Sequence, residues 1–135
     1  MIAQYLWIFA SLILLLLGSA HLYYTFFTNR FSIRNKEVEE GMKNSFPILT
    51  ARTTVWKAWI GFNASHSWCG IYIGLINIIF AFQYYELLKE SFSIKSLTVV
   101  SAFFLLYLGK RYWFNIPFTG ILISCICFTA AWFIM

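Results

Sequence analysis

Charged residues are scarce in this chain of 135 residues. Lys, Arg, Asp and Glu together make up 11% of it, aspartate is absent, and hydrophobic residues make up 61%. A soluble domain carries about 25% charged residues, so the composition excludes a soluble globular domain, a disordered chain and a coiled coil. The net charge of +5 comes from bases grouped beside apolar segments, so we expect no nucleic-acid partner.

The charged residues leave long gaps between them. Residues 1–29, 58–85 and 112–135 contain none, and residues 96–109 form a shorter fourth gap. A membrane-spanning helix needs about 20 mostly apolar residues, so three gaps suffice alone and the fourth needs its flanks. We predict an all-α integral membrane four-helix bundle, a single membrane domain over residues 1–135 with spans at about 4–27, 56–84, 93–109 and 113–134.

Three local features qualify this outline. The loop at 28–55 mixes both charge signs from Asn35 to Lys43, which predicts a short surface helix that ends before Pro47. Either Thr50 or Thr53 is expected to cap the second span. Lys95 is expected to reach the membrane interface and so lengthen the short third span.

The basic residues predict an orientation. Eight of the ten Lys and Arg residues lie in residues 30–57 and at 110–111, against two in residues 86–95, around the connection between the second and third spans. Loops on the cytoplasmic side of a membrane are enriched in Lys and Arg. We therefore expect a multi-pass protein of the bacterial inner membrane, with loops one and three cytoplasmic and both termini outside.

The second predicted span carries a polar stripe. Spacings of three and four residues place one set of side chains on a single helical face, which we expect to point into the bundle. The opposite face contains Phe62, Ile71, Ile73 and Ile78, and we expect it to meet lipid or to pack against apolar side chains. The stripe consists of Asn63, His66, Ser67, Gly70, Gly74 and Asn77. For Gly70, Gly74 and Asn77 we favour a packing role.

The two histidines of the chain, His21 and His66, lie on the inward stripes of the first and second spans at similar depths. They could be neutral side chains that hydrogen-bond to their neighbours, axial ligands of a haem, or part of a pocket for a lipid or quinone. A zinc or iron site lacks a third ligand. The predicted ligand-binding residues are His21, Thr25, Trp59, Asn63, His66 and Ser67.

No catalytic residues are predicted, so an enzyme is not the favoured reading. All five carboxylates are glutamates in predicted loops, out of reach of a hydroxyl–imidazole arrangement within the spans. Cys125 and Cys127 are separated by one residue in the sequence and point in different directions on a helix, so they are not a redox pair.

Two runs carry a resemblance to a known family. The segment Thr50–Ser67, which includes WKAWIGFNASHS, resembles a family of small bacterial four-span membrane proteins of unassigned activity. The segment Ser19–Phe26 is similar to the first-helix motif of that family. A looser likeness in architecture extends to the DoxX-like four-helix membrane proteins. The resemblance implies a four-span topology and points to the two histidine segments, but it implies no reaction.

Two functions are consistent with these patterns. One is a membrane-embedded site for a small hydrophobic ligand, a lipid, quinone or haem, around His21, Asn63 and His66. The other is a non-enzymatic accessory or assembly subunit, in which the glycine stripe and aromatic faces bind helices of a membrane-protein partner.

Overall fold

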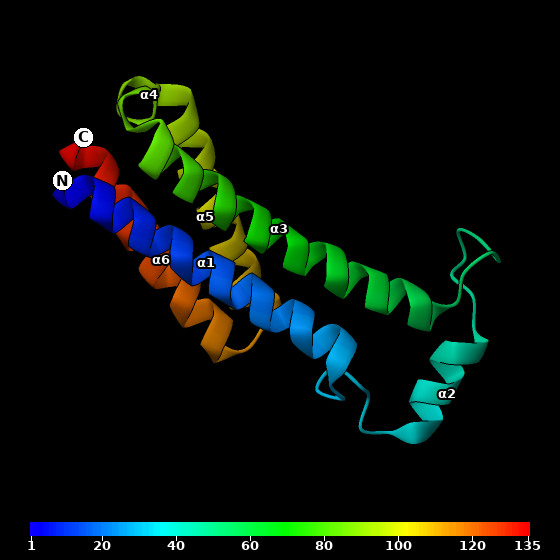
Figure 1. Cartoon of the computed structure of the whole chain (residues 1–135). Coiled ribbons are helices and arrows are strands. Elements are labelled where there is room, and N and C mark those ends of the chain that lie inside the picture. Colours follow the sequence, from blue (N-terminus) through cyan, green and yellow to red (C-terminus); the bar gives the residue numbers. More distant parts are fainter. The chain divides into compact units, whose positions relative to one another are not determined.

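The computed structural model describes every residue from Met1 to Met135, and the chain is helical without any strand. Four helices are long and apolar enough to cross a membrane, namely α1, α3, α5 and α6. This confirms the predicted all-α membrane fold with four spans. The helices are α1 (Ile2–Phe27), α2 (Lys36–Asn44), α3 (Val55–Gln83), α4 (Tyr85–Glu90), α5 (Phe92–Tyr112) and α6 (Asn115–Ile134) (Figure 1).

The helix ends follow local capping chemistry. The side chain of Asn35 accepts the backbone N–H groups of Glu37 and Val38 and so starts α2, the surface helix that the mixed charges predicted. Helix α3 starts after Thr54, whose hydroxyl accepts the Lys57 N–H at 3.3 Å. The expected caps Thr50 and Thr53 were therefore wrong, because both lie within the loop that precedes α3.

The segment between the second and third spans differs from expectation. It contains the short helix α4, which the sequence did not predict. Lys95 is only 8% exposed, and its Nζ donates to the carbonyl of Lys89 at 2.6 Å. The ammonium thus bonds a carbonyl in the last turn of α4, in the connection between the second and third spans, where helix carbonyls lack a partner within their own helix. The α5 helix is still long enough, at 21 residues, because it begins at Phe92.

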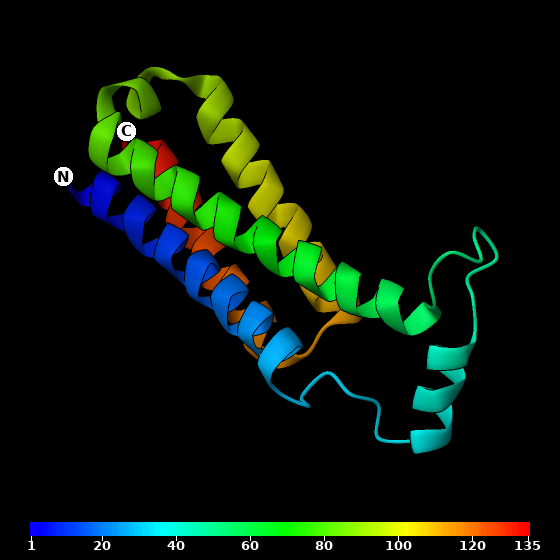
Figure 2. The ribbon, with the colours of Figure 1, turned by 45° about the vertical axis from the view of Figure 1, so that its right-hand side comes forward.

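The packing divides the chain into two compact units. The first contains Met1–Leu17 and Gly70–Met135, and the second contains Gly18–Cys69. Helices α1 and α3 each contribute to both units. In the first unit the two chain termini lie at the same end (Figures 1 and 2).

A buried polar network lies inside the first unit. The Oδ1 atom of Asn77 accepts the indole N–H of Trp7 and the hydroxyl of Thr98, both at 2.9 Å. The amide nitrogen of Asn77 donates to the carbonyl of Ile73. The network therefore joins α1, α3 and α5, and it supports the packing role expected for Asn77, since polar groups at membrane depth need internal partners.

Helices α1 and α3 approach each other closely at Gly74. A Cβ atom there would lie 2.8 Å from the Ser11 carbonyl oxygen and from the Leu15 nitrogen, so only glycine fits this packing distance. Phe62 is exposed as expected, but Ile71 is 8% exposed and Ile73 packs against the core. Of the two expectations for this face, these two isoleucines follow apolar packing and not lipid contact, because α3 packs against both α1 and α5 and its buried face is wider than the polar stripe.

Candidate polar cluster of His21, Asn63 and His66

The second unit brings the two histidine segments together. His21 lies two turns before the end of α1, and His66 lies three turns after the start of α3. Asn63 is buried at 6% exposure, and both imidazoles are half-buried. Three of the six predicted site residues thus come from two helices to form one polar cluster.

Asn63 fixes the protonation pattern of His21. Its amide nitrogen donates to the Trp59 carbonyl at 2.8 Å, so Oδ1 is the atom presented to Nε2 of His21 at 3.1 Å. Because Oδ1 only accepts, Nε2 carries the hydrogen. A neutral His21 then keeps its lone pair on Nδ1, which makes that nitrogen a hydrogen-bond acceptor.

The two imidazoles are in direct contact. The ring centroids of His21 and His66 are 5.4 Å apart, with an angle of 77° between the ring planes. Each ring also meets an aromatic neighbour. The Phe31 ring lies 4.4 Å from that of His21, and the Phe62 ring is nearly parallel to that of His66 at 6.4 Å.

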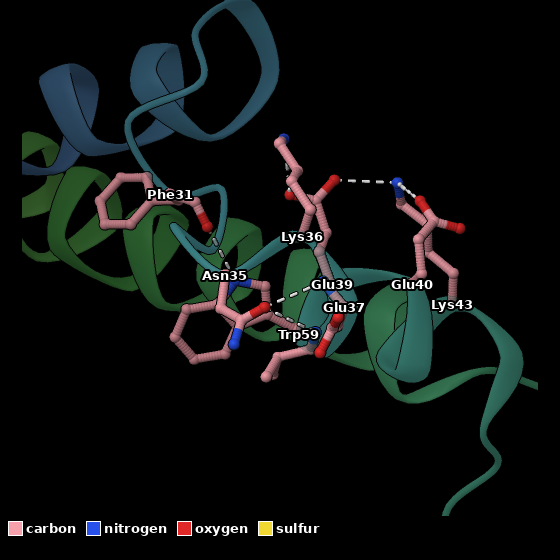
Figure 3. Close-up of polar contacts among 9 residues, drawn as sticks. Phe31, Asn35, Lys36, Glu37, Glu39, Glu40, Lys43 and Trp59 are labelled. Atoms are coloured by element: carbon pink, nitrogen blue, oxygen red, sulfur yellow. Dashed lines mark hydrogen bonds and ion pairs between the residues drawn. The ribbon is translucent and has the colours of Figure 1, made fainter.

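Phe31 is a residue of the cluster that the sequence did not reveal. It belongs to the loop after α1, where no periodicity indicates which side chain turns back. Its position depends on Trp59, whose indole N–H donates to the Phe31 carbonyl at 3.3 Å (Figure 3). Trp59 therefore anchors the loop beside His21 instead of offering its N–H to a ligand.

Thr25 and Ser67 have a similar local role. The Thr25 hydroxyl donates to the His21 carbonyl at 2.8 Å, and the Ser67 hydroxyl donates to the Asn63 carbonyl at 2.6 Å. Both bonds run one turn back along the same helix. These two predicted ligand-binding residues consequently use their hydrogens on the backbone that carries His21 and Asn63.

The cluster does not fit a bis-histidine haem. A haem bound by both residues would lie between the imidazoles, with a nitrogen of each ring directed at the iron. Instead the two rings touch edge to face, and Nε2 of His21 faces the Asn63 amide. No group of three or more His, Cys, Asp or Glu side chains could hold a metal ion.

Outside the spans, α2 holds two of the three acidic residues of the second unit, Glu39 and Glu40, in ion pairs. Glu39 contacts Lys43 at 2.8 Å and Lys36 at 3.3 Å, and Lys43 also contacts Glu40 (Figure 3). The hydrogen bond from Lys43, reinforced by Lys36, holds the pKa of Glu39 below its usual value. Glutamate–lysine pairs three or four residues apart stabilise a short helix.

The fold and the composition together define a multi-pass helical membrane protein. Comparison with protein-family models, curated proteins and solved structures gave no match. The resemblance of the segment Thr50–Ser67 to a four-span family therefore stays a prediction.

Proposed function

We propose that this protein binds a small hydrophobic molecule with a polar head, a lipid or a quinone, at the cluster of His21, Asn63 and His66. The contact between two half-buried imidazoles, one of them oriented by a buried amide, carries the proposal. Polar side chains at membrane depth are unfavourable and are typical of functional sites. Imidazole and amide groups can both donate and accept hydrogen bonds, so a polar ligand head that carries a hydroxyl or a carbonyl suits the cluster.

The aromatic neighbours suit an apolar ligand body. The Phe31 ring lies beside His21 and the Phe62 ring lies beside His66, and they come from the loop after α1 and from α3. Ligand sites commonly combine apolar walls with a few polar groups that fix orientation. The imidazoles would thus contact the polar head of the ligand, and the two phenylalanine rings would contact its apolar ring or chain.

The orientation of the cluster follows from the basic residues. Eight Lys and Arg residues lie in or beside the first and third connections between spans, against two in or beside the second. This distribution favours a bacterial inner-membrane protein with the first and third connections in the cytoplasm and both termini outside. The His21 and His66 side chains then lie in the cytoplasmic half of the bilayer, and the ligand enters from that leaflet.

Variants of the cluster test the proposal. His21→Phe and His66→Phe keep an aromatic ring but remove the polar nitrogens. After purification in a mild detergent, mass spectrometry should find a lipid or quinone with the natural protein and about tenfold less with either variant, since one lost hydrogen bond of about 1.4 kcal/mol corresponds to tenfold.

Ser65→Ala is the matched control. Ser65 is an exposed residue between Asn63 and His66, and its hydroxyl bonds the Phe62 carbonyl of its own helix. This variant should retain the ligand. Equal amounts of bound molecule in all four proteins would contradict a site at the histidines.

A second candidate function is that of an accessory subunit. Gly61, Ser65 and Cys69 are exposed at four-residue spacing on α3, and a Cβ atom at Gly61 would meet no atom within 4 Å. Small residues at this spacing let another membrane helix approach closely. Mild oxidation of native membranes should then link Cys69 to a partner, and the adduct should disappear in Gly61→Leu, whereas monomer alone in both proteins would contradict this function.

A further inference from the structure

The segment between α2 and α3 is a closed loop with a defined tip. The backbone N–H of Val55 donates to the Ser45 carbonyl at 2.9 Å, which closes residues 46–54 into a loop at the start of α3. Within it, the N–H of Thr50 donates to the Pro47 carbonyl at 3.1 Å. Ile48 and Leu49 are therefore the two central residues of a turn.

The tip of the 46–54 loop is apolar and fully exposed. Ile48 is 109% exposed and Leu49 is 93% exposed, while Phe46 near the base is 57% exposed. The centre of a turn normally carries glycine, asparagine, aspartate or serine. Two large aliphatic side chains at such a tip gain free energy only when another apolar surface covers them.

The charges near this loop favour an anionic surface. The ion pairs of the chain all lie within α2, so Arg52 and Lys57 make none. Residues 41–85 contain no acidic side chain. After the tip, the chain therefore carries two basic residues without ion pairs, Arg52 and Lys57. The next carboxylate in the sequence is that of Glu86.

The direction of the loop places it beside the membrane. It projects sideways from the first turn of α3, on the side away from α2 (Figures 1 and 2). That first turn includes Trp56, and Trp59 follows within the next turn. Tryptophans of this kind mark the level of the lipid head groups, so a loop that leaves the helix sideways there runs along the bilayer surface.

We propose that the 46–54 loop is a lipid anchor, in which Ile48 and Leu49 insert between lipid head groups and Arg52 and Lys57 bind anionic ones. Apolar side chains beside bases bind anionic bilayers through both burial and charge. This surface is separate from the histidine cluster. The lipid anchor holds the start of α3, which includes Trp59, at the level of the lipid head groups.

Trypsin cleavage after Arg52 measures the insertion directly. The full chain is reconstituted in nanodiscs of phosphatidylcholine, with or without phosphatidylglycerol. With phosphatidylglycerol, cleavage after Arg52 should be about tenfold slower than in the double variant Ile48→Asp with Leu49→Asp, because the embedded tip shields the bond. Cleavage after Arg34, an exposed loop residue before α2, should be equal in both proteins and serves as the internal control.

A spin label gives a second measurement that does not depend on the protease. The label is attached to Ile48→Cys, or to Gly41→Cys on the open face of α2, in a protein with its other cysteines replaced. The label at position 48 should be more accessible to oxygen than to a water-soluble nickel chelate, and more so with phosphatidylglycerol. The label at position 41 should show the opposite preference.

Three results would overturn the lipid anchor. One is a label at position 48 as accessible to nickel as the label at position 41 in both kinds of nanodisc. The second is an Arg52→Gln, Lys57→Gln variant whose label responds to phosphatidylglycerol as strongly as that of the parent. The third is protection of the tip in native membranes but not in nanodiscs, which would identify a protein partner as the cover.

Discussion

Asn77 is the residue at which three helices of the first unit meet through side-chain hydrogen bonds. Its single amide oxygen accepts from Trp7 on α1 and Thr98 on α5. Since Trp7 is fully buried and Thr98 is 6% exposed, neither donor has access to water if the amide is removed. Asn77 therefore provides the hydrogen-bond acceptor for two buried donors, the Trp7 indole N–H and the Thr98 hydroxyl.

Asn77→Leu should lower the free energy of unfolding by about 1–3 kcal/mol, because it strands two buried donors. Titration of the detergent-solubilised protein with sodium dodecyl sulfate measures this change. Thr119→Val is the control, since the exposed Thr119 hydroxyl bonds only the Asn115 carbonyl of its own helix, and it should change stability little. Equal losses in the two variants would mean that the network does not link the helices.

For single residues, the sequence predicted the helical face on which a side chain lies better than it predicted the hydrogen-bond partner of that side chain. The spacing of Asn63 and His66 placed them on the inward face, and the structure puts both beside His21. The same spacing could not show that Thr25 and Ser67 bond the backbone of their own helices. Which acceptor a hydroxyl takes depends on its rotamer, and helical periodicity contains no information on rotamers.

At the scale of helices, the contact between α1 and α3 at Gly74 predicts an asymmetry between two glycines. Gly74→Ala should destabilise the protein by about 1–3 kcal/mol, because the new methyl group meets backbone atoms that cannot rotate away. Gly61→Ala meets empty space and should be neutral or stabilising by up to about 1 kcal/mol, since alanine is the better helix former.

The same unfolding titration compares the two alanine variants under identical conditions. Both substitutions lie in α3 and add one methyl group to a helical glycine, so propensity alone would shift both in the same direction. A stabilised Gly74→Ala protein would show that α1 and α3 are further apart than the structure indicates.

Helix α2 should depend on pH through Glu39. The folded pKa of Glu39 is lowered from 4.5 by its hydrogen bond to Lys43, so the ion pairs stabilise α2 above pH 4.5 and are lost as the pH falls through the lower folded value. Nuclear magnetic resonance shifts of residues 36–44 should show this loss of helix. Glu39→Gln should remove the pH dependence, whereas Glu37→Gln, at a residue without an ion pair, should keep it.

The predicted helices agree with the structure where the local composition, either a long apolar run or a run of mixed charges, is enough to identify a helix. The first span was expected at 4–27 and α1 is Ile2–Phe27, and the mixed charges after residue 35 do form α2. Helix α4 was missed because its six residues are too few for a periodic pattern. The sequence left open whether Ile71 meets lipid or packs against other helices, because one helical stripe cannot show how many neighbours a helix has.

For the whole molecule, the distribution of basic residues predicts which side of the membrane each end occupies. Alkaline phosphatase fused after Met135 should be active, because both termini are expected outside the cytoplasm. Green fluorescent protein at the same position should be dark. A phosphatase fused after Thr50 in the first connection should be inactive, and the reverse pattern in these fusions would place the histidine cluster in the outer half of the bilayer.

The close approach of α1 and α3 at Gly74 also limits which substitutions this position can accept during evolution. A saturation-mutagenesis library, selected for folded protein, should retain only glycine at position 74, where any side chain collides with Ser11 and Leu15. Position 61 should accept many residues, since nothing lies within 4 Å of its Cβ direction. The two glycines of α3 would then differ in how many substitutions they tolerate. The difference would reflect the short distance between the α1 and α3 backbones at Gly74 and the open space beside Gly61.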